Sequence, residues 1–291
     1  MRRIRFSLSI LATLAFVASA CGGSKVTPLA MVQAASTATA QAKTASITMA
    51  MTGGKGALAN SSFNGAFDFD KHLISMTIDA SKLGIPGGTG TFNAVMDFGS
   101  GAVEYVQVPG LEKEFNGKHW MKVDLAAAMA TVCPGIDFGS LLKVQSGDPT
   151  SGLALLAAAN KVTVVGTETL HGAKTTHYSV IVDVTKVAAN ASPAARATMQ
   201  KLATYYTNPI RTVDVWLDDQ GRAVRFKQDV DMSQVKLPDC ITKAASAASN
   251  PFKGSFTMTM DMFDFGRPVN IAVPPDTDVA DLQQLMKSLR G

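Results

Sequence analysis

Regular alternation of apolar and polar residues is the feature that most constrains how this chain folds. Residues 255–265 show it best, because phenylalanine and methionine occupy every second position while threonine and aspartate lie between them. Side chains of a strand point to alternate faces, so this stretch is predicted to be a half-buried antiparallel strand. Its apolar face is mostly methionine, whose adaptable thioether suits contact with a flexible apolar ligand. An ordinary core strand is the alternative that this stretch alone leaves open.

The same alternation recurs along most of the chain, with turn residues between the segments. The predicted strands are 46–51, 62–69, 73–79, 91–98, 102–108, 118–125, 161–170, 175–184, 213–217, 224–232 and 255–265. Strands at this spacing predict one antiparallel sheet of about eleven strands. A sheet of this length that is apolar on one face must curl or close.

Several short, alanine-rich segments are predicted to contain helices. They are residues 28–45, one or two helices within 136–160, residues 192–206 and residues 278–289. Ser192 followed by Pro193 is typical of a helix start. These helices must cover the inner face of the curled sheet. We therefore expect an α+β fold in which residues 28–291 form a single domain.

Residues 1–20 have the layout of a secretory signal peptide. Three arginines among the first five residues precede an apolar run at 10–17, and three small residues then lead to Cys21. The apolar run is too short to span a bilayer stably. The small residues before Cys21 resemble a bacterial lipobox, in which the cysteine is acylated, although Ala18 stands where leucine is usual. Ordinary secretion with cleavage after Ala20 is the alternative.

Acylation of Cys21, for instance with palmitate, would make residues 21–27 a lipidated flexible tether. Such a tether would hold the protein on the outer face of the cell membrane without spanning it. The formal net charge of +4 includes the three arginines of residues 1–20, which contain no acid, so the mature value is 4 − 3 = +1. With 46% hydrophobic and 17% charged residues, the chain is typical of a folded protein. Its charge gives no reason to expect nucleic acid as a partner.

Cys133 and Cys240 are predicted to form a disulfide in an oxidising compartment. The disulfide would close a loop of roughly 100 residues and contribute about 4–5 kcal/mol in the chain-entropy model. Nearby prolines predict that both cysteines lie in loops. The four histidines are scattered and no CxxC motif is present, so we expect neither a metal nor another cofactor. The sequence contains no GxSxG, HExxH, paired-carboxylate or P-loop motif, so we do not expect an enzyme.

Short helices over a curved apolar sheet leave space, and a cavity lined by methionine, phenylalanine, isoleucine and valine suits acyl chains. The sequence leaves open the opposite outcome, in which the helices fill the interior completely. The residues predicted to contact a lipid are Met49, Met51, Phe67, Ile74, Met76, Ile78, Phe92, Met96, Val180, Val182, Val215, Phe226, Phe256, Met258 and Met260.

Several short segments resemble a known group of proteins. They are Cys21 with residues 117–124, 165–168, 171–172, 176–178, 215–222 and 269–275. In these segments and in the order of its elements, the chain resembles the LppX/LprA/LprF/LprG lipoproteins, within the wider LolA/LolB-like superfamily. The resemblance implies a U-shaped antiparallel half-barrel with helices on its concave side. It also implies carriage of lipids or lipoglycans within the envelope of actinomycete-type cells, with no catalytic site.

We therefore expect a monomeric, membrane-anchored lipoprotein that binds an acyl lipid or glycolipid, with a membrane exporter as a candidate partner. The alternative is an envelope sensor or protein-binding lipoprotein that uses the same sheet without a lipid cargo. The polar residues Arg225, Lys227, Asp229 and Asp231 could serve that role. Charged alternation of this kind is more often a solvated face.

Overall fold

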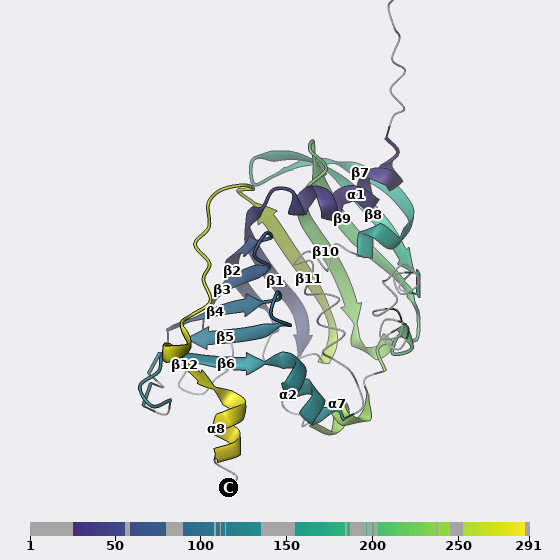
Figure 1. Ribbon diagram of the computed structural model, residues 1–291. Coiled ribbons are helices and arrows are strands. Elements are labelled where there is room, and N and C mark those ends of the chain that lie inside the picture. The colour runs from purple at the N-terminus through teal and green to yellow at the C-terminus, as the bar shows by residue number, and fades with distance from the viewer. Residues whose placement is uncertain are drawn as a thin grey trace, which may run out of the picture.

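A single sheet of twelve strands organises the protein. The computed structural model describes residues 26–55, 59–79, 90–107, 109–110, 112–113, 115–134, 155–183, 185–186, 196, 200, 203–236, 238–244 and 253–288. Within them the strand order is β12-β6-β5-β4-β3-β2-β1-β11-β10-β9-β8-β7. Figure 1 shows that the sheet curves strongly between its two edges and does not close into a barrel.

The strands follow one another mostly as hairpins. They are β1 (Thr44–Lys55), β2 (Ser61–Asp68), β3 (Leu73–Asp79), β4 (Thr91–Asp97), β5 (Val103–Gln107), β6 (Trp120–Asp124), β7 (Ala159–Leu170), β8 (Ala173–Asp183), β9 (Ile210–Asp218), β10 (Ala223–Asp231), β11 (Lys253–Phe263) and β12 (Val279–Asp281). The described helices are α1 (Pro28–Ala40), α2 (Leu125–Val132), α7 (Asp239–Ala244) and α8 (Leu282–Ser288), with the 3-10 turns η2 (Leu155–Ala158), η3 (Met232–Gln234) and η4 (Asp276–Asp278).

Strand register brings the apolar residues of neighbouring strands to one face. Met49 of β1 lies opposite Met260 of β11, which lies opposite Phe226 of β10 and, beyond it, Val215 of β9. Directly opposed residues of antiparallel strands share a face. We call this the inner face: it carries Met49, Met76, Met96 and Met258, and α1 packs on it.

Helix α1 fills one side of the inner face. Val32 and Ala35 of α1 are fully buried in the main core cluster, together with residues of β8, β9 and β10. Thr27 caps the start of α1 by accepting a hydrogen bond from the N–H of Ala30, and Pro28 occupies its first turn. The helix ends before Lys43, whose φ of 67° is a left-handed conformation that interrupts a helix.

A second, smaller core covers the opposite face of β3 to β6. Its buried residues are Leu73, Val95, Val103, Tyr105, Ile271 and Val279. Ile271 belongs to the segment that follows β11, and Figure 1 shows this segment running from the end of β11 to β12. These strands are therefore apolar on both faces, because the C-terminal segment shields the second face from water.

The close approach of β2 and β3 depends on a glycine. Gly65 lies opposite Met76, and a Cβ atom built at Gly65 would collide with the backbone carbonyl of Ser75. Only glycine allows two strands to approach this closely. A larger residue at position 65 would therefore force β2 and β3 apart.

The predicted fold class is confirmed, since the structure is an α+β protein with one large curved sheet. All eleven predicted strands are present, but β12 was missed and it pairs with β6 in parallel. The predicted helix at 28–45 ends at Ala40, and β1 begins at Thr44. The predicted C-terminal helix at 278–289 begins at Leu282, because residues 279–281 form β12.

Helices α2 and α7 were not predicted, and the expectation that both cysteines lie in loops is wrong in part. Cys133 is the C-terminal cap of α2, whereas Cys240 lies within α7. Most of the helices predicted at 136–160 and 192–206 falls outside the described residues. At the described end of the first segment, η2 leads directly into β7.

The hydroxyl group of Thr39 connects α1 to the sheet by hydrogen bonds. Its side chain is fully buried, donates to the carbonyl of Ala35 at 2.7 Å and accepts from the N–H of Ala223 at 2.9 Å. Thr39→Val keeps the shape but leaves the N–H of Ala223 unpaired, so we expect the free energy of unfolding to fall by about 1–3 kcal/mol. Thr39→Ser keeps the hydroxyl and should cost only about 1 kcal/mol for the lost methyl group. Urea unfolding followed by circular dichroism measures both, and a valine variant as stable as the wild type would contradict this role.

Candidate functional site

The inner face divides into a packed part and a partly open part. The packed part lies under α1 and η2. Five of the residues predicted to contact lipid belong to it and are 0–2% exposed: Phe67, Val180, Val182, Val215 and Phe226. Such side chains already have protein neighbours on all sides, so we assign them to the core and not to a ligand surface.

The open part lies over β1 to β4 and β11. Seven of the residues predicted to contact lipid are only partly buried there: Met49, Met76, Ile78, Phe92, Met96, Phe256 and Met258. Met51, Ile74 and Met260 are buried, at 7–9% exposure, between the two parts. The predicted set therefore includes both core residues and a partly exposed group of methionine, isoleucine and phenylalanine.

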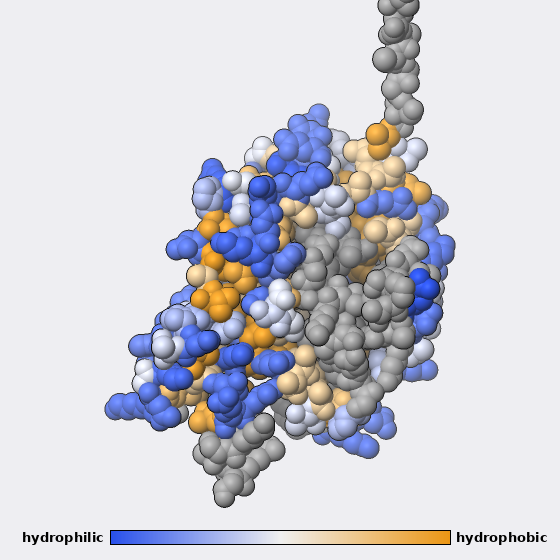
Figure 2. Space-filling model, viewed as in Figure 1, coloured by the Kyte–Doolittle hydropathy of each residue, from blue (hydrophilic) through white to orange (hydrophobic). Residues whose placement is uncertain are grey.

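Strand register makes the open part continuous. Ile78 lies opposite Phe92, Met96 opposite Ile74, and Met51 opposite Met258. Figure 2 shows hydrophobic residues gathered over β2 to β5 on the face in view. A contiguous, partly exposed apolar surface of this kind is typical of a ligand or partner site.

The inner face also carries polar side chains, and two of them lie beside the methionines of the open part. Gln228 of β10 lies opposite Met258, and Glu104 of β5 lies opposite Met96. Burial raises the pKa of Glu104 above its ordinary value, because desolvation disfavours the charged carboxylate. Neither residue was predicted from the sequence to belong to the site. For Glu104 the reason is that its neighbours Val103 and Tyr105 are apolar and themselves resemble inward-facing residues.

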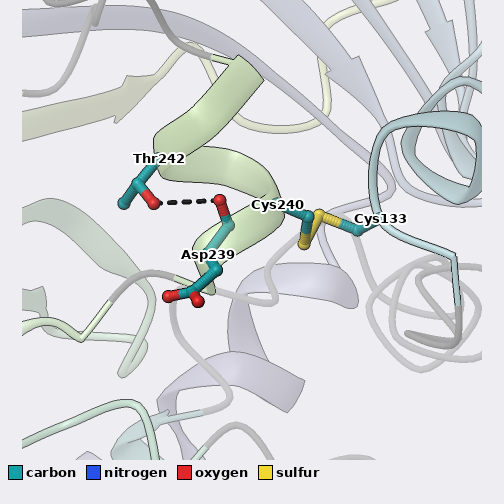
Figure 3. The surroundings of a disulfide bond; sticks show 4 residues. All are labelled: Cys133, Asp239, Cys240 and Thr242. Carbon is teal, nitrogen blue, oxygen red and sulfur yellow. Dashed lines mark hydrogen bonds between the residues drawn. A yellow bond between two sulfur atoms is a disulfide. The ribbon is translucent and has the colours of Figure 1, made fainter.

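A disulfide joins two helices that lie far apart in the sheet order. Cys133 after α2 is bonded to Cys240 in α7, with a Cα–Cα distance of 5.2 Å (Figure 3). Helix α2 follows β6, near one edge of the sheet, whereas α7 lies between β10 and β11 near its middle. The disulfide therefore links the segment after β6 to the segment before β11, and the strands of the open part lie between β6 and β10 in the sheet order. Its 107-residue separation corresponds to about 4–5 kcal/mol in the chain-entropy model.

The opposite face of β8 to β11 carries a network of charged and aromatic residues. Arg225 donates to both carboxylate oxygens of Asp261 at 2.6 Å, and Nε2 of His171 lies 2.8 Å from the same carboxylate. Burial raises the pKa of Asp261, but the hydrogen bonds from Arg225 and His171 bring it below its ordinary value. Trp216 stacks on His177 at 4.0 Å and donates to Glu168.

These charges are satisfied by one another. His177 pairs with Asp214 at 3.0 Å, and His171 pairs with Asp261. Among the described residues, no group of three or more histidines, cysteines and acids could hold a metal ion. The network is best explained as a means of fastening the β7–β8 hairpin to β11.

The lipidation site predicted at Cys21 lies outside the described residues, as do the predicted signal peptide at 1–20 and most of the predicted tether at 21–27. Among the described helices none has the length and apolar character needed to cross a bilayer. The described residues begin at Val26, two residues before the start of α1.

The fold and the inner face together define a curved-sheet protein with a partly open apolar surface. No family model matches the sequence. An uncharacterized 31.2 kDa protein of Streptomyces griseus is 27% identical over 179 residues, which are 59% of this chain and 50% of that protein. The protein named "Putative lipoprotein SCO4650" of Streptomyces coelicolor is 25% identical over 172 residues, 59% of this chain and 45% of that protein. The matched region thus spans about half the length of these curated relatives.

A solved structure adds a likeness of fold. The lipoprotein LppX of Mycobacterium tuberculosis aligns over 84% of this chain and 97% of its own, with 12% identity and a TM-score of 0.46. LppX is one of the proteins after which the family that this sequence resembles is named. At this level of similarity we draw no conclusion from LppX about a ligand.

The raised pKa of Glu104 predicts how the stability of the protein depends on pH. Glu104 binds a proton more tightly in the folded protein than in the unfolded chain. Protonation of Glu104 therefore contributes fully to the free energy of unfolding below the ordinary pKa of 4.5. That stabilisation is lost as pH rises through the folded pKa. Glu104→Gln should therefore have nearly wild-type stability at about pH 4 and become relatively more stable than the wild type as pH rises.

Urea unfolding of both proteins across this pH range provides the measurement. Glu112→Gln is the matched control: backbone N–H groups of Glu112 and Gly110 lower the pKa of Glu112, so the sign of its pH-dependent difference should be reversed. A Glu104→Gln difference that does not change with pH would show that the carboxyl is effectively solvated.

Proposed function

We propose that this protein is a membrane-anchored lipoprotein that binds an acyl lipid or glycolipid on its inner face and carries it within the cell envelope, without catalysing a reaction. The observation that carries the proposal is the division of the inner face. One part is packed under α1, while the other retains seven partly exposed apolar residues. A protein that needed only a core would gain stability by covering them.

The chemistry of the open part suits an acyl chain. Met49, Met76, Met96 and Met258 contribute four thioether side chains that pack against the edge of the main core. Unbranched methionine side chains adapt to apolar ligands of variable shape, as acyl chains are. The proposed ligand surface is therefore narrower than the set predicted from the sequence, because the fully buried valines and phenylalanines are excluded from it.

The proposed anchor is an acyl group on Cys21, after removal of residues 1–20. Residues 21–27 would then be the tether and residues 28–291 the lipid-binding domain, which we expect to act as a monomer on the outer face of the cell membrane. A membrane exporter is the partner class that such a carrier would require. The relative from Streptomyces coelicolor, whose name includes the word lipoprotein, supports this assignment.

A protein-binding lipoprotein is the second candidate, and one observation favours it. Val164 and Val165 on the edge strand β7 are 52% and 56% exposed. An exposed apolar edge strand can pair with another chain. Mass spectrometry of an organic extract of the purified protein separates the candidates. Acyl lipid in near-stoichiometric amount supports the carrier, and an extract without lipid favours protein binding.

Met76→Asp tests the open part directly. Because Met76 is partly buried on the inner face, a carboxylate there should oppose an apolar ligand and lower the amount of bound lipid by at least about tenfold. Thr77→Asp, on the next residue of β3 but on the opposite, exposed face, is the matched control and should retain lipid. Co-purified lipid per protein is the readout, and equal amounts in both variants would argue against binding at this surface.

Cys21→Ser tests the anchor independently of the cargo. Without the thiol of Cys21 no thioether-linked lipid can be attached. Among the described residues, no helix is long and apolar enough to span the membrane. We expect the variant to leave the membrane fraction and collect in the medium, while the wild type stays with the membrane. Cell fractionation followed by immunoblotting measures this, and a variant that stays membrane-bound would disprove acyl anchoring.

A further inference from the structure

Glu104 lies where the pattern of the inner face predicts an apolar residue. Its directly opposed neighbours are Met96 on β4 and Val123 on β6, and opposed residues share a face. Its chain neighbours Val103 and Tyr105 are buried in the second core on the other face. The side chain of Glu104 therefore belongs to the inner face, beside the partly exposed methionines.

Among the described residues, the partly buried carboxyl group of Glu104 has no compensating partner. The described part of the protein gives it no hydrogen bond and no ion pair, and burial alone accounts for its raised pKa. The buried aspartates of the same sheet differ. Asp97 accepts two hydrogen bonds from Ser100, and Asp218 accepts from Arg222. An unpaired, desolvated carboxyl group costs stability, and such groups are concentrated at functional sites.

We propose that Glu104 is the subsite for the polar head of the bound lipid, and that this head is uncharged and carries hydroxyl and ester groups. The proposal rests on the proposed lipid-binding function. The oxygens of a carboxyl group accept hydrogen bonds from hydroxyl groups in either protonation state, and a carboxyl group that carries a proton also donates to an ester carbonyl, so such a head offers Glu104 the partners that it lacks. A phosphate head would place a negative charge beside an acidic group that offers it no cation, which is unfavourable in surroundings of low dielectric constant.

The position of Glu104 also orients the ligand. From β5 to β11 the sheet runs through β4, β3, β2 and β1, which is about 24 Å at the usual strand spacing. One acyl chain of a bilayer leaflet spans about 15 Å, half of the hydrocarbon core. With its head at Glu104, an acyl chain of this length reaches across β4 and β3 to about β2, so Met76 lies within its reach and the methionines of β1 and β11 lie beyond its end.

The experiment uses the full-length protein purified in detergent, with bound lipid counted by native mass spectrometry. The probes are dioleoylglycerol, which has one hydroxyl and two esters, dioleoyl phosphatidic acid, and squalene, which contains no oxygen. Glu104→Leu should lower the occupancy by dioleoylglycerol about 3- to 10-fold, the effect of losing one or two hydrogen bonds. Its occupancy by squalene should stay the same or rise.

Two control variants separate the subsite from general damage. Glu104→Gln keeps a donor and an acceptor and should retain dioleoylglycerol within about twofold. Glu112→Leu removes an acidic side chain from the segment between β5 and β6, outside the inner face, and should bind all three probes as the wild type does. A circular-dichroism melt of each variant confirms that it is folded.

The outcomes are distinct. Wild-type protein that binds dioleoylglycerol in preference to phosphatidic acid, with a selective loss in Glu104→Leu, supports the subsite. Equal dioleoylglycerol occupancy in wild type and Glu104→Leu overturns the subsite while lipid binding stands. Preference of the wild type for phosphatidic acid, or for an ammonium-headed lipid carried from the cell, overturns the uncharged head. Absence of all three probes and of any cellular lipid from the wild type overturns the proposed function itself.

Discussion

The register of one long antiparallel ladder is the constraint on which the rest of this structure depends. Side chains alternate faces with a period of two, so a slip of one residue between two strands would turn a whole row of apolar side chains outward. Met49, Met260 and Phe226 lie in one such row across three strands. Because strands from both ends of the chain meet at the β1–β11 pair, the two halves of the inner face form a single surface.

That surface is larger than the helix packed against it. Helix α1 covers the β8–β10 side, where valines and Phe226 are fully buried. The β1–β4 side is methionine-rich and keeps partial exposure. Branched valine packs tightly in a fixed core, whereas methionine tolerates a changing neighbour. The residue types on the two sides therefore match the two environments.

Alternation in the sequence was sufficient to predict eleven strands and the α+β class, because local patterning determines which residues share a strand face. It could not show which inner-face residues α1 would bury, since that depends on where a distant helix docks. The alternation also gives the wrong faces for the residues of β5. Val103 and Tyr105 have the pattern of inward-facing residues, but the C-terminal segment around Ile271 buries them on the opposite face. Glu104 consequently turns inward, a position that only the register with β4 and β6 reveals.

The disulfide limits how such a site can exchange a ligand. Cys133 and Cys240 connect the helix after β6 to the helix before β11, so the two sides of the open part cannot move apart at that end while the bond is intact. Any widening needed to admit a lipid must then come from side-chain rearrangement or from the ends of the strands away from α2 and α7. Methionine side chains, with three rotatable bonds each, permit the first of these at low cost. A rigid sheet held by a covalent link and lined by adaptable side chains is thus a consistent arrangement for holding an apolar ligand whose shape varies.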